Sequence, residues 1–405
     1  MLAFEVQNGR RIPSPEEIIQ SSYRHRSVSK FADSDDQLDF AGNRMAAEAP
    51  AEWKDTMTVG TSHRRYDPTQ TYRWNYENAP EPVDVEVPTF GQDWTFCGRK
   101  VPSPLGIPAG PLLNGKWVLY YASLGFDVLT YKTVRSSQRD CYPLPNLVSV
   151  ETDQLTGGEQ RLAESASASG SWAVSFGMPS TEPDFWRRDI EETRNRLPTE
   201  KLLSVSVVGT VQPGWTIDDL AGDYALCAKW AVDAGADAIE TNFSCPNVET
   251  CDGQLYQNPA EAVKVAEAVR QAIGDRPLIL KIGHTTAAAD AEELLESVAP
   301  FATAIAMTNS VATTIEGKDG TLLFDGQQRG ICGEATFDAS LQQTRLFSDL
   351  IHKRGDDLRI ISVGGVSTGS HVRSCLEAGA ESVHIATAAM LDPTVAVKIR
   401  RDWQS

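Results

Sequence analysis

The sequence predicts an α/β protein, a (β/α)8 TIM barrel with an N-terminal extension, on three observations. From about residue 89 onward, short apolar runs alternate with longer amphipathic segments, which indicates repeated strand–helix units and a parallel sheet. Eight such runs can be placed, and each ends in polar or glycine-rich sequence. The segments between them carry Ala, Val, Leu and Ile at three- and four-residue spacing, as helices packed on a sheet do.

Eight parallel strands with intervening helices most simply close into a barrel. A doubly wound open sheet is the competing architecture, but it usually carries a G-x-G-x-x-G fingerprint after its first strand, and residues 106–110 read Gly-Ile-Pro-Ala-Gly. Residues 259–273 and 287–298 are examples of the predicted helices. The predicted strands cover residues 105–109, 127–132, 202–208, 238–242, 278–282, 304–308, 359–363 and 382–386.

Residues 1–88 differ from the barrel region, 89–405, and predict an extension or arm instead of a second large core. They are polar, carry charges of both signs, and contain the aromatic positions Tyr72, Trp74 and Tyr76 ahead of a proline-bearing stretch. Three positions for this arm stay open: packed on the barrel, over the site, or against a second subunit.

The composition excludes several classes of partner. A formal net charge of -18 repels nucleic acids and anionic membrane surfaces. No stretch approaches eighteen uninterrupted apolar residues, and the first thirty lack an apolar run of seven, so we expect a cytoplasmic protein with no membrane partner. The seven scattered cysteines contain no C-x-x-C pair and read as reduced thiols, so we predict no iron–sulfur or other metal site.

The loop after the fourth predicted strand holds the strongest candidate for chemistry. Cys245 lies three residues beyond that strand, in a turn imposed by Pro246, where its thiol can project into the barrel mouth. Asn242 and Asn247 flank it with amide donors and acceptors. The alternative interpretation is a small buried hydrophobe beside two turn-forming asparagines.

Polar residues also end several other predicted strands. Lys132 and Lys281 must each meet an anion or a strong acceptor if they point into the barrel mouth, because burying an unpaired lysine is costly. Gly364-Gly365 and Ala386-Thr387 follow the last two strands, where barrels commonly bind phosphate through backbone amides. Surface lysines and a tight glycine turn are the alternatives.

In order and spacing, these motifs resemble the dihydroorotate dehydrogenase family over roughly residues 92–395. Asn-x-Ser-Cys-Pro-Asn-Val is similar to the signature of the soluble members and of their relative, dihydropyrimidine dehydrogenase. Each short motif is weak alone, whereas the ordered set is specific. The other matching motifs are Pro108-Ala109-Gly110, Asn114-Gly115, Tyr131-Lys132-Thr133, Ser175-Phe-Gly177-Met-Pro179, Lys281, Thr308-Asn309-Ser310, Gly330-Ile-Cys-Gly333, Gly364-Gly365 and Ala386-Thr387.

The resemblance implies an FMN-dependent dehydrogenase that oxidises dihydroorotate to orotate, with hydride passing to flavin N5 and a proton to Cys245. Lys281 would lie near flavin N1 and O2, and Lys132 would contact both the flavin and the substrate region. The implied flavin-binding residues are Ala109, Gly110, Lys132, Thr133, Asn242, Lys281, Thr308, Gly333, Gly364, Gly365, Ala386 and Thr387. The implied substrate-binding residues are Asn242, Asn247, Asn309, Ser310, Ser175, Gly177 and Met178.

One departure from the family pattern bears on the substrate. Val174 stands where an asparagine usually contacts the orotate-type ring, and a lost amide partner costs about 1 to 3 kcal/mol, enough to change which pyrimidine-like ring is preferred. Residues 145–171 form a long excursion, either a mobile lid or an ordered surface segment. His284 and His384 are interpreted as structural or rim residues. We expect a homodimer whose electrons leave to a diffusible acceptor or a partner protein.

Three other functions compete with this interpretation. A dehydrogenase or reductase of another heterocycle, of the dihydrouracil type, would use the same Cys245 chemistry. A tRNA dihydrouridine synthase shares the barrel, flavin and cysteine, but the acidic chain argues against it. A flavin-binding protein without turnover is the third possibility, suggested by Val174 and the arm.

Overall fold

The computed structural model describes residues 6–7, 10–11, 63–166, 170–244 and 254–404. The chain divides into two compact units, residues 1–48 and 49–405. In the first unit, the described residues form the antiparallel pair β1 (Val6–Gln7) and β2 (Arg10–Arg11). The second unit carries all the remaining elements. Within the described ranges, no helix has both the length and the apolar character needed to cross a bilayer.

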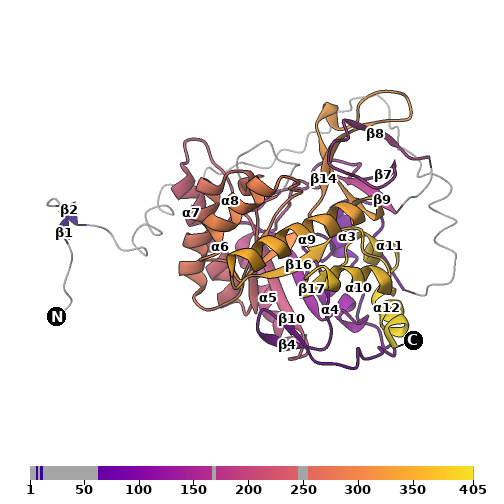
Figure 1. Cartoon of the computed structure of the whole chain (residues 1–405), viewed down its shortest axis with the longest axis horizontal. Coiled ribbons are helices and arrows are strands. Elements are labelled where there is room, and N and C mark those ends of the chain that lie inside the picture. The colour runs from indigo at the N-terminus through magenta and orange to yellow at the C-terminus, as the bar shows by residue number, and fades with distance from the viewer. Residues whose placement is uncertain (1–5, 8–9, 12–62, 167–169, 245–253, 405) are drawn as a thin grey trace, which may run out of the picture. The chain divides into compact units, whose positions relative to one another are not determined.

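In the described part of the second unit, eight parallel strands close into a barrel, in which β17 pairs back onto β5 (Figure 1). Each strand begins within one residue of its expected position, so the predicted (β/α)8 barrel is confirmed. The strands are β5 (Leu105–Ile107), β6 (Val128–Val134), β10 (Leu202–Val207), β11 (Ala238–Asn242), β12 (Leu278–Lys281), β13 (Ala304–Met307), β16 (Arg359–Val363) and β17 (Ser382–His384).

Helices follow the barrel strands, and local signals set their ends. Thr216 and Asp219 form a capping box at the start of α6, Pro259 occupies the first turn of α7, and Gly355 ends α9 in the left-handed conformation. The helices are α4 (Gly115–Ser123), α5 (Pro183–Arg196), α6 (Ile217–Asp233), α7 (Pro259–Ile273), α8 (Ala288–Val298), α9 (Phe337–Arg354), α10 (Gly369–Glu377), α11 (Thr387–Leu391) and α12 (Val395–Gln404), with short 3-10 turns η2 (Leu255–Gln257), η3 (Phe324–Gly326) and η4 (Glu334–Thr336).

A two-stranded hairpin closes the amino end of the barrel. It consists of β3 (Trp94–Phe96) and β4 (Arg99–Val101). Phe96 and Val101 are buried in one cluster with inward-facing apolar residues of the barrel strands, among them Val128 and Leu202. The interior at this end is therefore packed and apolar, which leaves the carboxyl end for a ligand.

A second sheet stands at the carboxyl end of the barrel (Figure 1). Its five strands in the described residues close on themselves, and they come from two excursions, one after β6 and one after β13. The ring encloses a small apolar core of its own. The strands are β7 (Leu147–Glu151), β8 (Arg161–Glu164), β9 (Ser171–Val174), β14 (Val311–Glu316) and β15 (Arg329–Gly333). The predicted excursion, residues 145–171, contains β7 and β8 and ends where β9 begins, and whether it moves as a lid stays a prediction.

The described part of the predicted arm, from residue 63 onward, packs on α4 of the barrel. Its short helix α3 (Tyr72–Glu77) is capped by Thr71, whose hydroxyl accepts from Trp74 N. The Trp117 indole donates to the Asn75 carbonyl at 3.1 Å, and Asn114 Nδ2 donates to the Tyr76 carbonyl at 2.8 Å. These bonds anchor the arm on the barrel. A domain boundary at residue 88 stays a prediction.

Candidate active site

Two adjoining cavities open at the carboxyl ends of the barrel strands. The larger measures about 220 Å³ and the smaller about 100 Å³. The larger extends toward the loops after β16 and β17, and the smaller lies between the ends of β6, β11 and β12. Together they form one bent site with shared walls. The shared residues are Ala109, Gly110, Val174, Phe176, Lys281, Asn309 and Cys332.

The far end of the larger cavity is lined by residues of three loops. Gly364 and Gly365 follow β16, Ala386 and Thr387 follow β17, and Gly333 ends β15. Gly365 has φ +71°, and a Cβ built on it would lie 2.5 Å from the Phe337 nitrogen, so a larger residue does not fit. A glycine-rich wall of this kind leaves main-chain amides accessible, the type of surface that accommodates a phosphate.

Lys281 is a buried cation at the junction of the two cavities. It ends β12 and points into the barrel mouth, where its Nζ donates to the Ala109 carbonyl at 3.2 Å. No carboxylate of the described residues lies within ion-pair distance of it. Because an unpaired buried ammonium is costly, this position favours an anionic ligand beside Nζ.

Lys132, on β6, is buried in the wall of the smaller cavity between two aromatic rings. Its Nζ lies 4.7 Å from the ring centre of Tyr72 on the arm and 4.5 Å from that of Phe176. It also approaches the Gly110 carbonyl at 3.4 Å. The two ring faces attract the ammonium group, so they hold it in a defined position.

Amide side chains stand opposite these lysines in the smaller cavity. Asn309 lines both cavities, and its Nδ2 donates to the Ser244 carbonyl at 2.5 Å. Asn242, at the end of β11, accepts from Ser244 N at 3.2 Å, and its Nδ2 lies 3.6 Å from Met178 Sδ. Thr133, Ser310, Gly177 and Met178 complete the predicted residues of this wall.

Two predicted site residues line neither cavity, because they point away from it. Ser175 is buried behind the wall, where its N donates to the Asn146 carbonyl, its carbonyl accepts from Asn146 Nδ2, and its hydroxyl accepts from Arg329 Nε at 3.0 Å. Thr308 donates its hydroxyl to the Gln343 side chain at 2.7 Å. The roles of Ser175 and Thr308 in ligand binding therefore stay predictions.

Cys245 and Asn247 lie outside the described residues. Ser244, the last described residue before Cys245, is buried and bonded to Asn309 and Asn242, both of which line the smaller cavity. The roles of Cys245 and Asn247 stay predictions. Val174 lies in the shared wall, so an apolar side chain does occupy a position next to the ligand space.

Two titratable groups are buried in the barrel near Lys281. Burial raises the pKa of Glu240 on β11, against the lowering effect of the Lys281 charge and of a hydrogen bond with Ser206. Burial, followed by the Lys281 charge, lowers the pKa of His384 to about 3, so this imidazole is neutral at physiological pH. His384 lines the larger cavity, whereas His284 lines a separate surface cleft. The neutral histidine leaves Lys281 as the cation at the cavity junction.

Several cavity residues were not predicted from the sequence. Phe176 and Cys332 line both cavities and lie inside the motifs Ser175-Phe-Gly177 and Gly330-Ile-Cys-Gly333. Their position within these motifs was the signal from which their place in the cavity wall could have been predicted. Tyr66 on the arm and Trp172 on β9 also line the larger cavity. No local pattern marks these two, because they reach the site only through long-range packing.

Comparison with known proteins adds a family to this geometry. The family "Dihydroorotate dehydrogenase" matches residues 93–405. A dihydroorotate dehydrogenase from Dictyostelium discoideum is 30% identical over 361 residues, which cover 82% of this chain and 95% of that protein. The catalytic subunit of a dihydroorotate dehydrogenase B (NAD(+)) from Methanopyrus kandleri is 28% identical, covering 72% and 83% of the two chains.

A solved structure supports the same fold. The DHODH of Eimeria tenella, crystallised with ferulenol, superposes with a TM-score of 0.64 over 82% of this chain and 88% of that one, at 16% sequence identity. At this identity the likeness concerns the fold alone, and it agrees with the eight-stranded barrel described above.

Proposed function

This chain belongs to the dihydroorotate dehydrogenase family, and we propose that it binds FMN in the two adjoining cavities and oxidises dihydroorotate to orotate. As a member of that family, it is an oxidoreductase acting on CH–CH groups. The observation that carries the proposal is the position of Lys281, a buried cation where a glycine-rich cavity meets an amide-lined one.

The residues present fit an FMN molecule. Gly364, Gly365 and Thr387 would hold the phosphate, since Gly365 has no room for a side chain and glycine-rich loops line that end of the cavity. Lys281 would face the part of the isoalloxazine ring where negative charge develops on reduction. FMN, when bound, supplies a two-electron acceptor for the CH–CH bond of the substrate.

The chain's own groups would hold the substrate and take its proton. Asn242 and Asn309 carry the paired amide donors and acceptors that a flat pyrimidine-like ring requires. Lys132, fixed between two rings, would supply positive charge toward the substrate carboxylate. Cys245 would remove the proton from one ring carbon as hydride leaves the neighbouring carbon, so that one C=C bond forms and two C–H bonds break.

An anaerobic absorbance titration tests this function. Dihydroorotate added to the purified yellow protein should bleach the flavin band near about 450 nm. Cys245→Ser should slow that bleaching about 100- to 10,000-fold without releasing the flavin, whereas the control Cys97→Ser, at the opposite end of the barrel, should leave the rate unchanged. A colourless protein that FMN cannot reconstitute would contradict the proposal.

A second candidate substrate is favoured by Val174. Because this apolar side chain lines both cavities, a ring without a hydrogen-bonding group at that edge, of the dihydrouracil type, would lose nothing there. A yellow protein that is bleached by dihydrouracil and not by dihydroorotate would select this alternative. One inert to both would be the flavin-binding protein without turnover.

The electron acceptor and assembly remain predictions. The relatives' names include an NAD(+)-linked enzyme and, in Neisseria meningitidis, a quinone-linked enzyme 26% identical over 72% of this chain and 80% of that protein. Neither acceptor follows for this chain. Cytoplasmic location and a homodimer rest on the sequence alone, and light scattering of the purified protein would test the dimer.

A further inference from the structure

Arg135 is a buried arginine directly after β6, three residues beyond Lys132. Its side chain is fully inaccessible to solvent. It does not line either cavity, and no motif in the sequence marked it. The acceptors of its guanidinium group, however, include carbonyls of two loops at the carboxyl end of the barrel, and one of these loops walls the smaller cavity.

Three hydrogen-bonding directions of the guanidinium group are used to join these loops. Nε donates to the Met178 carbonyl at 3.1 Å, in the loop after β9, and Nη1 donates to the Gly209 carbonyl at 2.6 Å, in the loop after β10. Nη1 also reaches Thr210 Oγ1 at 3.4 Å. In addition, the backbone nitrogen of Arg135 donates to Ser180 Oγ at 3.1 Å. Arg135 thus contacts the 175–180 loop at two points.

That loop adopts a conformation that its own residues do not prefer. Met178 has φ +51°, in the left-handed region that side-chain-bearing residues rarely adopt, and Gly177 before it has φ +74°. A Cβ on Gly177 would lie 2.7 Å from the Tyr142 ring. Such a backbone persists where the surroundings over-determine it, and the bond from Arg135 to the Met178 carbonyl is part of those surroundings.

The other side of the loop is held independently. Ser175 N donates to the Asn146 carbonyl at 2.8 Å, and Asn146 Nδ2 donates to the Ser175 carbonyl at 2.9 Å. Arg329 Nε donates to Ser175 Oγ at 3.0 Å. The first residue of the loop is therefore fixed by the five-stranded ring, and Met178 is held from the barrel by Arg135. Ser180 is held both by Arg135 and by two backbone hydrogen bonds with Arg139, at 2.9 Å each.

We propose that Arg135 is a positioning residue for the substrate: it holds the Met178 peptide in its left-handed conformation and so shapes the wall of the smaller cavity. The inference rests on the proposed function for the identity of the ligand. A guanidinium group suits this task because its planar fork reaches two carbonyls of different loops at once, which the single ammonium of lysine does not reproduce.

Arg135→Lys is the informative variant, because it keeps the positive charge and removes the planar guanidinium group that reaches both loops. Binding of orotate to the oxidised FMN-loaded enzyme should weaken about 10- to 100-fold, with KM for dihydroorotate rising more than kcat falls, while bound flavin is retained. Hydrogen–deuterium exchange of the peptide spanning residues 175–180 should become at least about tenfold faster, because the Met178 peptide loses the bond that holds its conformation and the loop opens more often.

Arg400→Lys is the matched control. Arg400 is also a buried arginine that donates to backbone carbonyls, those of Gly125 and Pro88, but at the amino end of the barrel. Arg400→Lys should lower the melting temperature and leave orotate affinity and exchange of the 175–180 peptide unchanged. If the two variants instead lose only stability, in equal measure, Arg135 is a structural residue and the inference is wrong.

A double-mutant cycle with Met178→Gly separates conformation from packing. Glycine adopts φ +51° without cost, so Arg135→Lys should accelerate exchange of the loop less in the Met178→Gly background than in the natural chain. Equal acceleration in both backgrounds would overturn the inference. If the natural chain binds no orotate, the proposed function fails, yet the exchange measurements still decide the role of Arg135.

Discussion

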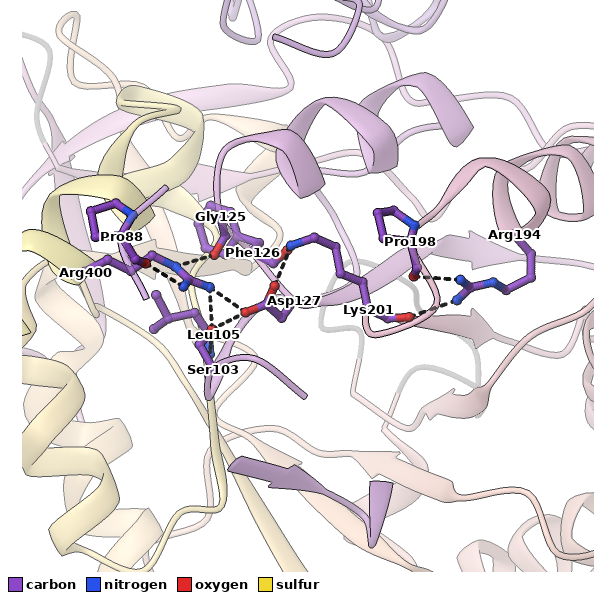
Figure 2. A network of polar contacts seen from close by, with 10 residues as sticks. All are labelled: Pro88, Ser103, Leu105, Gly125, Phe126, Asp127, Arg194, Pro198, Lys201 and Arg400. Atoms are coloured by element: carbon purple, nitrogen blue, oxygen red, sulfur yellow. Dashed lines mark hydrogen bonds and ion pairs between the residues drawn. The ribbon is translucent and has the colours of Figure 1, made fainter. Parts of the chain in front are cut away.

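The two ends of the barrel differ in how completely their buried charged groups are paired. At the amino end, Asp127 pairs with Lys201 and with Arg400, whose Nη2 lies 2.5 Å from Oδ2, and the remaining donors of Arg400 reach the Gly125 and Pro88 carbonyls at 2.9 Å each (Figure 2). Ser103 completes the same network, donating to Asp127 and accepting from Arg400.

At the carboxyl end, polar groups are buried with fewer protein partners. Lys281 donates to one carbonyl, and among the described residues Glu240 Oε1 and both nitrogens of His384 have no hydrogen-bond partner. Removing one partner from a fully paired buried network is costly, whereas incompletely paired groups around a cavity lower stability and favour a ligand. The contrast agrees with the proposal that a ligand binds at the carboxyl end.

The largest effect that this comparison predicts is on stability at the amino end. Asp127→Asn removes the negative charge that pairs Lys201 and Arg400 and leaves two cations facing each other in a buried site, so unfolding should become easier by about 3 to 5 kcal/mol. Chemical denaturation measures this, with turnover per folded molecule unchanged. Asp233→Asn, which breaks an exposed pair with Lys229, is the control with little expected effect. A loss of turnover in the folded Asp127→Asn protein would break the contrast.

Exchanging a lysine for methionine at each end sharpens the comparison. Lys281→Met should lower kcat/KM about 100- to 1,000-fold, because it removes the positive charge at the cavity junction, and should not lower stability. Lys201→Met at the amino end should show the reverse, a lower melting temperature with normal kcat/KM. Steady-state kinetics and thermal unfolding of both variants give the answer, and a less than tenfold kinetic effect for Lys281→Met would count against its role.

The buried histidine predicts a pH dependence of stability. Since the folded pKa of His384 is about 3 and the unfolded one about 6.5, the unfolded state alone binds the proton between these values. The contribution of neutral His384 to the free energy of unfolding should therefore be fully present above pH 6.5. Below that pH it should fall by about 1.4 kcal/mol per pH unit. His384→Gln should reduce that slope in denaturation curves measured from pH 7.5 to 5. Parallel pH profiles of the two proteins would show that His384 is not the group responsible.

The smallest predicted effect concerns the arm. Tyr72→Leu removes one of the two ring faces next to Lys132, a contact of about 0.5 to 1 kcal/mol, so kcat/KM should fall about two- to fivefold. Tyr72→Phe keeps the ring and should keep the activity. Trp74→Leu, on the same helix α3 but over Arg64, should also leave kcat/KM unaltered. Equal losses in all three variants would mean that the arm contributes folding only.

Much of the barrel follows from local sequence. The strands β11 and β16 coincide with the predicted ranges 238–242 and 359–363, because strands buried on both faces form continuous apolar runs that end in polar residues. Lys281 could be placed at the end of a buried strand for the same reason, but its direction into the barrel mouth comes from the structure.

The five-stranded ring could not be predicted in this way. Its strand β9 pairs with β15, for example Val174 with Gly330, about 150 positions further along the chain. Short strands that alternate apolar and polar residues do not specify their partners, since register depends on packing and turns. The same pairing turns Ser175 toward Arg329 and brings Val174 and Cys332 into the cavity wall.

The sequence by itself determined the barrel, the order of its strands and the polar residues that end them. Each of these follows from local patterns, namely short apolar runs that end in polar residues and alternate with amphipathic segments. Only the tertiary structure decided which of those polar residues face the cavities, since that depends on contacts between segments far apart in the chain. Asn309 and Ser310 line a cavity while their neighbour Thr308 is bonded to Gln343 on α9, and Arg135, without any motif, joins two loops. Local patterns cannot encode such choices, because a side chain's direction near a loop is set by what packs against it.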